Sequence, residues 1–183
     1  MKRLLLAAAL SLAAALSLAA ALSLAAALPV AAQTVVIVRH AEKADASADP
    51  ALSEAGEARA QALAAALVNA HPSVILTSPL QRTRLTAAPT AEYHSVSPEA
   101  VPLEGGVEAH VAAVAARVRA APEDATILIV GHSNTVPLIA RALGYAEAAD
   151  MPECEYDRLT RLKLEGGSVM AIVTTYGDRT SCS

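Results

Sequence analysis

Three short runs of β-branched and aliphatic residues recur along the chain, at residues 35–38, 74–76 and 126–130. Runs of this length without polar alternation are typical of strands that are buried on both faces of a sheet. A further strand is predicted at residues 93–97.

Helix signals lie between and after these runs. Ser53, followed by Glu54 and Glu57, predicts the N-cap and first turns of a helix over residues 53–69. Ser78-Pro79 predicts a second helix start, with Ser78 as the N-cap. Two further helices are predicted, one from the helical spacing of Val residues at 107–118 and one at residues 135–143. Because strands and helices alternate, we expect an α/β fold, a three-layer αβα sandwich with a mainly parallel central sheet.

The last part of the chain predicts a β-hairpin. Two strand-like segments, residues 156–164 and 168–176, flank the turn sequence Glu165-Gly-Gly-Ser168. If residues 165 and 168 pair, Cys154 lies opposite residue 179, three residues before Cys182. The two cysteines therefore either form a disulfide at the open end of the hairpin or remain as two unpaired thiols.

Residues 1–32 have the pattern of a secretory signal peptide. Lys2 and Arg3 precede an apolar stretch that contains Ala-Ala-Ala-Leu-Ser-Leu three times. Val30 and Ala32 fit the −3 and −1 positions of a cleavage site after Ala32, which leaves one domain at residues 33–183. The alternative is an uncleaved membrane anchor, because the stretch is long enough to span a bilayer. In both cases we expect the domain to be exported, either periplasmic or secreted.

Composition narrows the class of protein. Hydrophobic residues make up 54% of the chain, but only six of the first 32 residues lie outside that class, so the leader causes much of the excess. The leader also holds two of the 14 Lys and Arg residues, which leaves 12 basic against 18 acidic residues in the domain. This acidic balance argues against nucleic-acid binding, and we expect membrane contact only if the leader stays attached.

The residues that follow the predicted strands indicate where a ligand would bind. Parallel sheets bind ligands beyond the carboxyl ends of their strands. Arg39 and His40 follow the first strand, Arg82 comes shortly after the second, and His132 follows the strand at residues 126–130. Two His and two Arg side chains are therefore expected at one edge of the sheet.

Four motifs in this order resemble the histidine phosphatase superfamily (branch 1), which includes the cofactor-dependent phosphoglycerate mutases. They are Arg39-His-Ala-Glu-Lys43, Leu52-Ser-Glu-Ala-Gly56, the segment Thr77-Ser-Pro-Leu-Gln-Arg82-Thr-Arg-Leu-Thr86, and Gly131-His-Ser-Asn-Thr135. Small exported members with an Arg-His-Ala-Glu-Lys motif look most similar. The resemblance implies a phosphoglycerate mutase-like fold and a phosphatase that needs neither cofactor nor metal ion.

The resemblance also implies a role for each residue at the sheet edge. His40 is the expected nucleophile, which forms a phosphohistidine. Arg39 and Arg82 hold phosphate oxygens with their planar guanidinium groups. His132, as an imidazolium, stabilises the transferred group, and we expect backbone amides around Ser133 and Asn134, at a helix N-terminus, to add donors to the phosphate site.

The sequence does not identify the residue that acts as the general acid. The family resemblance points to a Glu after the third strand region, and the chain offers Glu104 and Glu108, with a third alternative of another acid or none. Glu42 and Lys43 either contact substrate or support the loop after His40, and Ser78 either caps its helix or helps to bind phosphate.

The sequence thus predicts an exported phosphomonoesterase that acts on a phosphorylated small molecule or glycan. Two other functions fit the same pocket. One is a binding protein for phosphate or phosphoglycan that does not turn over its ligand, and the other is a phosphomutase, which the short chain disfavours.

Overall fold

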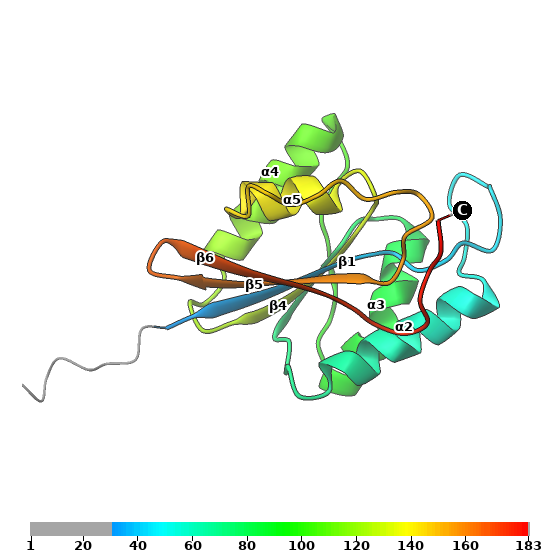
Figure 1. Ribbon diagram of the computed structural model, residues 1–183, viewed down its shortest axis with the longest axis horizontal. Coiled ribbons are helices and arrows are strands. Elements are labelled where there is room, and N and C mark those ends of the chain that lie inside the picture. The colour runs from blue at the N-terminus through cyan, green and yellow to red at the C-terminus, as the bar shows by residue number, and fades with distance from the viewer. Residues whose placement is uncertain (1–30, 183) are drawn as a thin grey trace, which may run out of the picture. The chain divides into compact units, whose positions relative to one another are not determined.

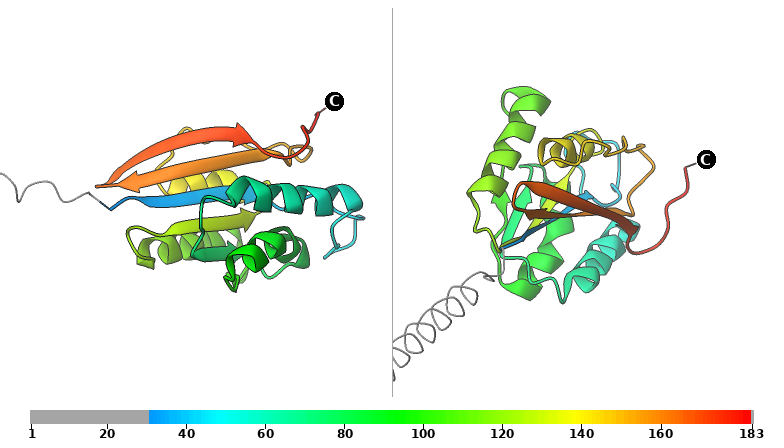
Figure 2. Two further views of the ribbon diagram at one scale, coloured as in Figure 1. Left: turned by 90° about the horizontal axis from the view of Figure 1, so that it is seen from below. Right: turned by 60° about the vertical axis from the view of Figure 1, so that its left-hand side comes forward.

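The computed structural model describes residues 31–182. The predicted signal peptide therefore lies outside the described residues, apart from Ala31 and Ala32. The described chain builds one six-stranded sheet in the order β3-β2-β4-β1-β5-β6 (Figures 1 and 2). The strands are β1 (Gln33–Arg39), β2 (Val74–Thr77), β3 (Glu99–Ala100), β4 (Thr126–Gly131), β5 (Arg158–Glu165) and β6 (Ser168–Thr175).

The sheet is mainly parallel. Strands β3, β2, β4 and β1 pair in parallel, whereas β5 runs antiparallel to β1 and β6 antiparallel to β5. A helix connects each of these parallel strands to the next one along the chain, as the alternation of strand and helix signals predicted. The helices are α2 (Glu54–Leu67), α3 (Gln81–His94), α4 (Gly106–Ala120) and α5 (Val136–Ala142).

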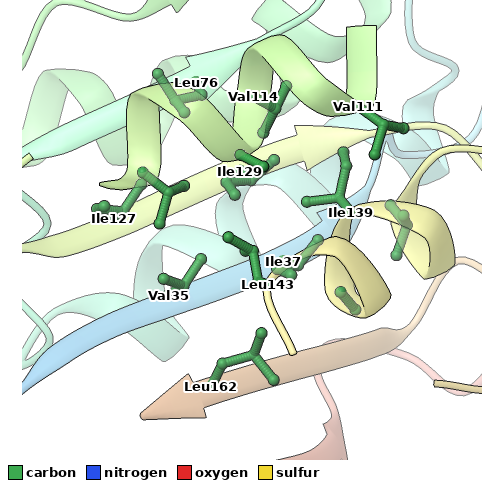
Figure 3. Close-up of a cluster of buried hydrophobic side chains, with 14 of the residues drawn as sticks. Val35, Ile37, Leu76, Val111, Val114, Ile127, Ile129, Ile139, Leu143 and Leu162 are labelled. Carbon is green, nitrogen blue, oxygen red and sulfur yellow. The ribbon is translucent and has the colours of Figure 1, made fainter. Parts of the chain in front are cut away.

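The helices cover the two faces of the sheet, α2 and α3 on one and α4 and α5 on the other (Figure 1). Val36 and Val38 pack with α2 and α3, while their strand neighbours Val35 and Ile37 pack with α4 and α5. Figure 3 shows the second of these clusters, where Ile139 meets the strands. The continuous apolar strands therefore serve two cores at once, and the expected three-layer α/β fold is confirmed.

Two local predictions are wrong. Residues 93–97 form no strand, because α3 continues to His94 and ends at Ser95 in the left-handed conformation (φ 57°). The third strand lies slightly later, at Glu99–Ala100. Ser78 is not a helix N-cap either, because α3 begins at Gln81 with Leu80 in the cap position. The side chain of Ser78 bonds elsewhere, as described below.

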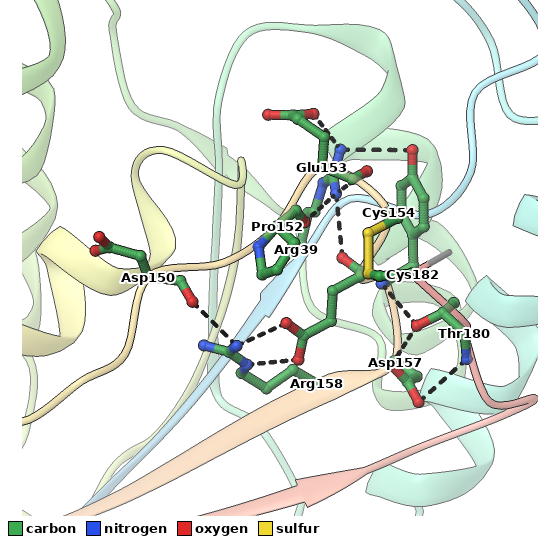
Figure 4. The surroundings of a disulfide bond; sticks show 11 residues. Arg39, Asp150, Pro152, Glu153, Cys154, Asp157, Arg158, Thr180 and Cys182 are labelled. Carbon is green, nitrogen blue, oxygen red and sulfur yellow. Dashed lines mark hydrogen bonds and ion pairs between the residues drawn. A yellow bond between two sulfur atoms is a disulfide. The ribbon is translucent and has the colours of Figure 1, made fainter.

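The hairpin prediction is confirmed. Glu165 pairs with Ser168 and Arg158 with Thr175, so the register follows the predicted turn. Cys154 and Cys182 form a disulfide with their Cα atoms 5.4 Å apart (Figure 4). This bond ties the C-terminal tail to the segment between α5 and β5.

Candidate active site

The carboxyl ends of β1, β2 and β4 bring the predicted residues together. Arg39 is level with Gly131 on the neighbouring strand, so His40 and His132 leave the sheet side by side. Their rings lie edge to face with centroids 5.3 Å apart. The backbone N–H of His40 donates to the carbonyl of Gly131 at 2.9 Å, which holds the two strand exits in register.

His40 has the tautomer that a nucleophile at Nε2 needs. Its Nδ1 lies 2.8 Å from the carbonyl oxygen of Ala41, which can only accept, so Nδ1 carries the proton and Nε2 keeps its lone pair. The ring is 4% exposed. Burial lowers the pKa of His40 from 6.5 to about 4, and the nearby Arg39 charge acts in the same direction. The imidazole is therefore neutral at neutral pH.

His132 is also neutral in the protein by itself. Burial, followed by the charges of His40 and Arg82, lowers the pKa of His132 to about 3. The imidazolium expected from the sequence therefore needs a nearby anion to hold its proton. Nε2 of His132 lies 2.9 Å from Oγ of Ser78. Ser78 Oγ also lies 3.0 Å from Oγ1 of Thr83, so this hydroxyl joins β2 and α3 to the His pair.

The loop after His40 is held by a buried ion pair. Nε and Nη2 of Arg59 on α2 donate to the carboxylate of Glu42 at 2.7–2.9 Å. Ser53 caps α2 and donates its backbone N–H to the Glu42 carbonyl at 3.0 Å. Gly56 packs so closely that a Cβ there would lie 2.3 Å from the same carbonyl oxygen. Glu42 thus supports the loop, and the motif at residues 52–56 is explained by contact with that loop.

Arg82 approaches the His pair from the first turn of α3. Its Nη1 lies 3.7 Å from Oδ1 of Asp49, and its Nε is buried without a hydrogen-bond partner among the described residues. Arg82 and His132 line one cavity of about 270 Å³, together with Asn134. Arg84, two residues further along α3, is exposed. The structure therefore brings Arg82 to the cavity, as the sequence predicted.

Arg39 is held by a segment that the sequence analysis did not include. Its Nη1 donates to the backbone carbonyls of Pro152, Glu153 and Glu155 at 2.6–3.2 Å (Figure 4). The guanidinium carbon lies 4.1 Å from the ring centroid of Tyr156. Nε of Arg39 is buried and has no hydrogen-bond partner in the described part of the chain. Since Nη2 also donates, to Glu153 and to the hydroxyl of Tyr156, both ends of the guanidinium are occupied and Arg39 presents no open bidentate clamp in this state.

Glu153 is the carboxylate nearest to the predicted phosphate donors. Its Oε2 accepts from Nη2 of Arg39 at 2.8 Å, and its Oε1 accepts from the hydroxyl of Ser133. The hydrogen bond from Ser133 and the charge of Arg39 hold the pKa of the Glu153 carboxyl below its usual range. The local sequence does not distinguish Glu153 from Glu155 two residues later. The only signal nearby is Cys154, as one end of the possible disulfide.

The two candidate acids of the sequence analysis lie apart from these contacts. Glu104 is exposed in the turn before α4, and Glu108 is exposed in the first turn of α4. Their neighbours Leu103, Gly106 and Val107 line the cavity that also holds Arg82 and His132, but the two Glu side chains do not. A general-acid role for either residue stays a prediction.

The other histidines occupy structural positions. Nδ1 of His110 lies 2.9 Å from the Pro102 carbonyl, and His71 and His94 stack edge to face. Over residues 31–182, no group of three or more His, Cys, Asp or Glu side chains is arranged to hold a metal ion. In the same range, no helix is long and apolar enough to cross a bilayer.

Comparison with known proteins agrees with this arrangement. The model of the histidine phosphatase superfamily (branch 1) matches residues 35–103, which include Arg39, His40 and Arg82. The match covers the segment from β1 to the turn before α4, and it makes this part of the chain similar to the superfamily. None of the curated proteins matches the chain.

Several solved structures share the fold. A putative phosphohistidine phosphatase SixA from Nakamurella multipartita is 26% identical, with 83% of this chain and 99% of that chain covered and a TM-score of 0.56. A mycobacterial hydrolase gives 17% identity, coverage of 81% and 99%, and a TM-score of 0.61. A mycobacterial glucosyl-3-phosphoglycerate phosphatase gives 16% identity, coverage of 80% and 97%, and a TM-score of 0.58, and that structure contains inorganic phosphate.

Proposed function

We propose that the protein is an exported, metal-independent phosphatase that hydrolyses phosphomonoesters through a phosphohistidine on His40. The observation that carries the proposal is the state of His40, a neutral imidazole whose proton is held on Nδ1 by the Ala41 carbonyl. The match of residues 35–103 to the histidine phosphatase superfamily supports a phosphatase.

The chemistry follows from the groups around His40. Phosphoryl transfer depends mainly on positioning and on stabilising the charge of the transferred group. Nε2 of His40 attacks phosphorus while Arg82, whose buried Nε lacks a partner, holds phosphate oxygens. A phosphate dianion beside His132 raises the pKa of that imidazole, so His132 gains a proton and stabilises the equatorial oxygens. Water then opens the nitrogen–phosphorus bond and returns His40 to its starting state.

The positive charge at the site makes a metal ion unnecessary in this proposal. Arg39, Arg82 and a protonated His132 together supply the charge that a divalent cation contributes in other phosphatases. Arg39 adds to this charge from its anchored position, through the buried Nε and through Nη2.

The substrate class is a phosphorylated small molecule or glycan. Solved structures with a similar fold are named for glucosyl-3-phosphoglycerate and for phosphohistidine as substrates. The cavity of about 270 Å³ beside Arg82 and His132 has the space for the group that carries the phosphate. A binding protein without turnover is the second candidate, because the carboxylates predicted as general acids make no contact with the His pair.

Hydrolysis of p-nitrophenyl phosphate by residues 33–183 in the presence of a chelator tests the proposal. We expect turnover by the wild-type domain and none by His40→Ala, with His71→Ala as the matched control because His71 is exposed and outside the site. Acid-labile phosphate on the wild-type protein after rapid quenching would identify the phosphohistidine. Equal background rates for wild type and His40→Ala would favour the binding protein, and loss of activity on chelation would refute the metal-free mechanism.

Export is supported by the disulfide, since such bonds persist in oxidising compartments. N-terminal sequencing of the protein recovered from the periplasm or medium tests the cleavage site. A mature chain that begins at Gln33 is expected, and an intact leader in the membrane fraction would favour the anchor.

A further inference from the structure

Glu153 occupies a position between the two donors that the proposed function gives to phosphate. Its carboxylate bridges Nη2 of Arg39 and the hydroxyl of Ser133, and both groups belong to the predicted phosphate site. The carboxylate is the anion that neutralises these donors in the free protein. A substrate phosphate that binds Arg39 and Ser133 must displace it.

The backbone of Glu153 is held in place, whereas its side chain has open space around it once its two hydrogen bonds are broken. The Glu153 carbonyl accepts from Nη1 of Arg39 at 2.6 Å, and the next residue, Cys154, is tied to Cys182 (Figure 4). The side chain itself is 79% exposed. Displacement by phosphate therefore moves the carboxylate by rotation about its own side-chain bonds, and it leaves the carboxylate at the rim of the phosphate site.

A second cavity lies at this rim. It has a volume of about 220 Å³ and is lined by Ser133, Asn134 and Glu153 together with residues of α5 and of the segment before Glu153. Asn134 lines both this cavity and the one that holds Arg82 and His132. A leaving group in the second cavity would lie beside Glu153, which lines that cavity. Glu104 and Glu108 line neither of the two cavities.

We propose that Glu153 is the general acid and base of the phosphoryl transfer. The inference rests on the proposed phosphatase function and names the residue that the sequence left open.

The binding of substrate favours uptake of a proton from solvent by the Glu153 carboxylate. In the free protein the Ser133 hydroxyl and the Arg39 charge keep the carboxylate ionised. Once phosphate takes over both partners, the carboxylate loses its hydrogen bond and faces a dianion, and both changes favour the protonated form. The same event that fills the phosphate site thus prepares the acid.

The two steps balance in atoms and electrons. In the first, the lone pair of His40 Nε2 forms the bond to phosphorus, the phosphorus–oxygen bond to the leaving group breaks, and Glu153 gives its proton to that oxygen. In the second, water attacks phosphorus and passes a proton to the Glu153 carboxylate. The nitrogen–phosphorus bond then breaks, its electron pair returns to Nε2, and inorganic phosphate leaves.

The test compares leaving groups in the variant Glu153→Gln. A glutamine side chain has the shape of Glu and keeps an oxygen that accepts from Arg39, but it cannot transfer a proton. The substrates are p-nitrophenyl phosphate, whose phenolate leaves without protonation, and an alkyl phosphate such as glycerol phosphate, whose alkoxide requires it. For the alkyl substrate we expect kcat to fall about 10²-fold or more, while the aryl substrate loses less than about tenfold.

Matched variants separate this role from a structural one. Glu147→Gln removes an exposed carboxylate elsewhere on the surface and should leave both rates unchanged. Glu153→Asp keeps the acid and should recover part of the alkyl phosphate rate. A parallel loss on both substrates would show a structural role, and the same leaving-group effect in Glu104→Gln or Glu108→Gln would identify another acid. Either result overturns the inference while the phosphatase proposal stands, whereas that proposal fails if wild type hydrolyses neither substrate.

Discussion

Removal of the Cys154–Cys182 bond is expected to destabilise the protein by a calculable amount. The two cysteines are 28 residues apart in sequence. Closing a loop of this length in the unfolded chain removes conformational entropy worth about 3.6 kcal/mol at 25 °C. The double variant Cys154→Ser/Cys182→Ser should therefore unfold with a free energy lower by about that amount, which for a domain of this size lowers Tm by roughly 10 °C.

The assay is urea denaturation followed by circular dichroism, with thermal unfolding as the second measurement. Because the disulfide acts on the unfolded chain, the variant should also show a larger m-value, since its unfolded state exposes more surface. Wild type treated with a reductant serves as the control and should behave like the double variant. The variant itself should not respond to reductant.

Two results would refute this reasoning. A loss of stability below about 1 kcal/mol would mean that the loop is already restrained by other contacts in the unfolded chain. A titration that finds two free thiols in the purified protein would mean that the bond does not form. The activity of the variant is informative as well, because Cys154 lies between residues whose carbonyls hold Arg39.

Other properties of the site lead to further predictions. Burial lowers the pKa of His40 to about 4 and that of His132 to about 3. Below pH 6.5 these two residues therefore take up protons in the unfolded chain but not in the folded protein. The free energy of unfolding should accordingly fall by roughly 2 kcal/mol or more between pH 7 and pH 5. Urea denaturation at both pH values measures this, and a pH-independent stability would contradict the burial argument. Gly56→Ala should cost about 1–3 kcal/mol and lower kcat/KM, because the added methyl group pushes the Glu42 carbonyl and the loop that carries His40. Phosphate binding at pH 7 should take up protons at His132 and Glu153, which calorimetry in buffers of different ionisation enthalpy detects, and a heat that does not depend on the buffer would refute it.

Much of the fold could be predicted because its signals are local. The strands β1, β2 and β4 are continuous apolar runs, and a parallel sheet buried on both faces requires such runs. The hairpin register followed from its Gly-Gly turn alone. The position of β3 could not be predicted, because Glu99–Ala100 is a two-residue exposed strand without an apolar pattern.

Some residues of the candidate site could likewise be predicted from the sequence, and others could not. His40, Arg82 and His132 could be placed because each follows a strand or begins the helix after it, and parallel strands end at one edge. The hydrogen bond between the side chains of Ser78 and His132 could not be predicted, because the local sequence Ser-Pro is equally typical of a helix cap.

The segment that holds Arg39 lies more than 110 residues after it in the sequence, so its role could not be predicted. Arg39 meets the carbonyls of Pro152, Glu153 and Glu155 only because β5 returns beside β1 and the disulfide brings the tail against this segment. Neither the spacing nor the composition of residues 152–156 contains that information.

The proposed phosphate site must also be stable without an anion, and three separate features of the free protein contribute to this. Arg39 is neutralised by the carboxylate of Glu153, Arg82 lies within 3.7 Å of Asp49, and burial keeps His132 uncharged. Each arrangement lowers the repulsion among cationic groups at one sheet edge, and each is reversed by an anion that offers the same groups a better partner. In the free protein the positive charge at the site is thus partly compensated, while the Nε groups of Arg39 and Arg82 are left without hydrogen-bond partners among the described residues. We expect phosphate to bind by taking over these local partners.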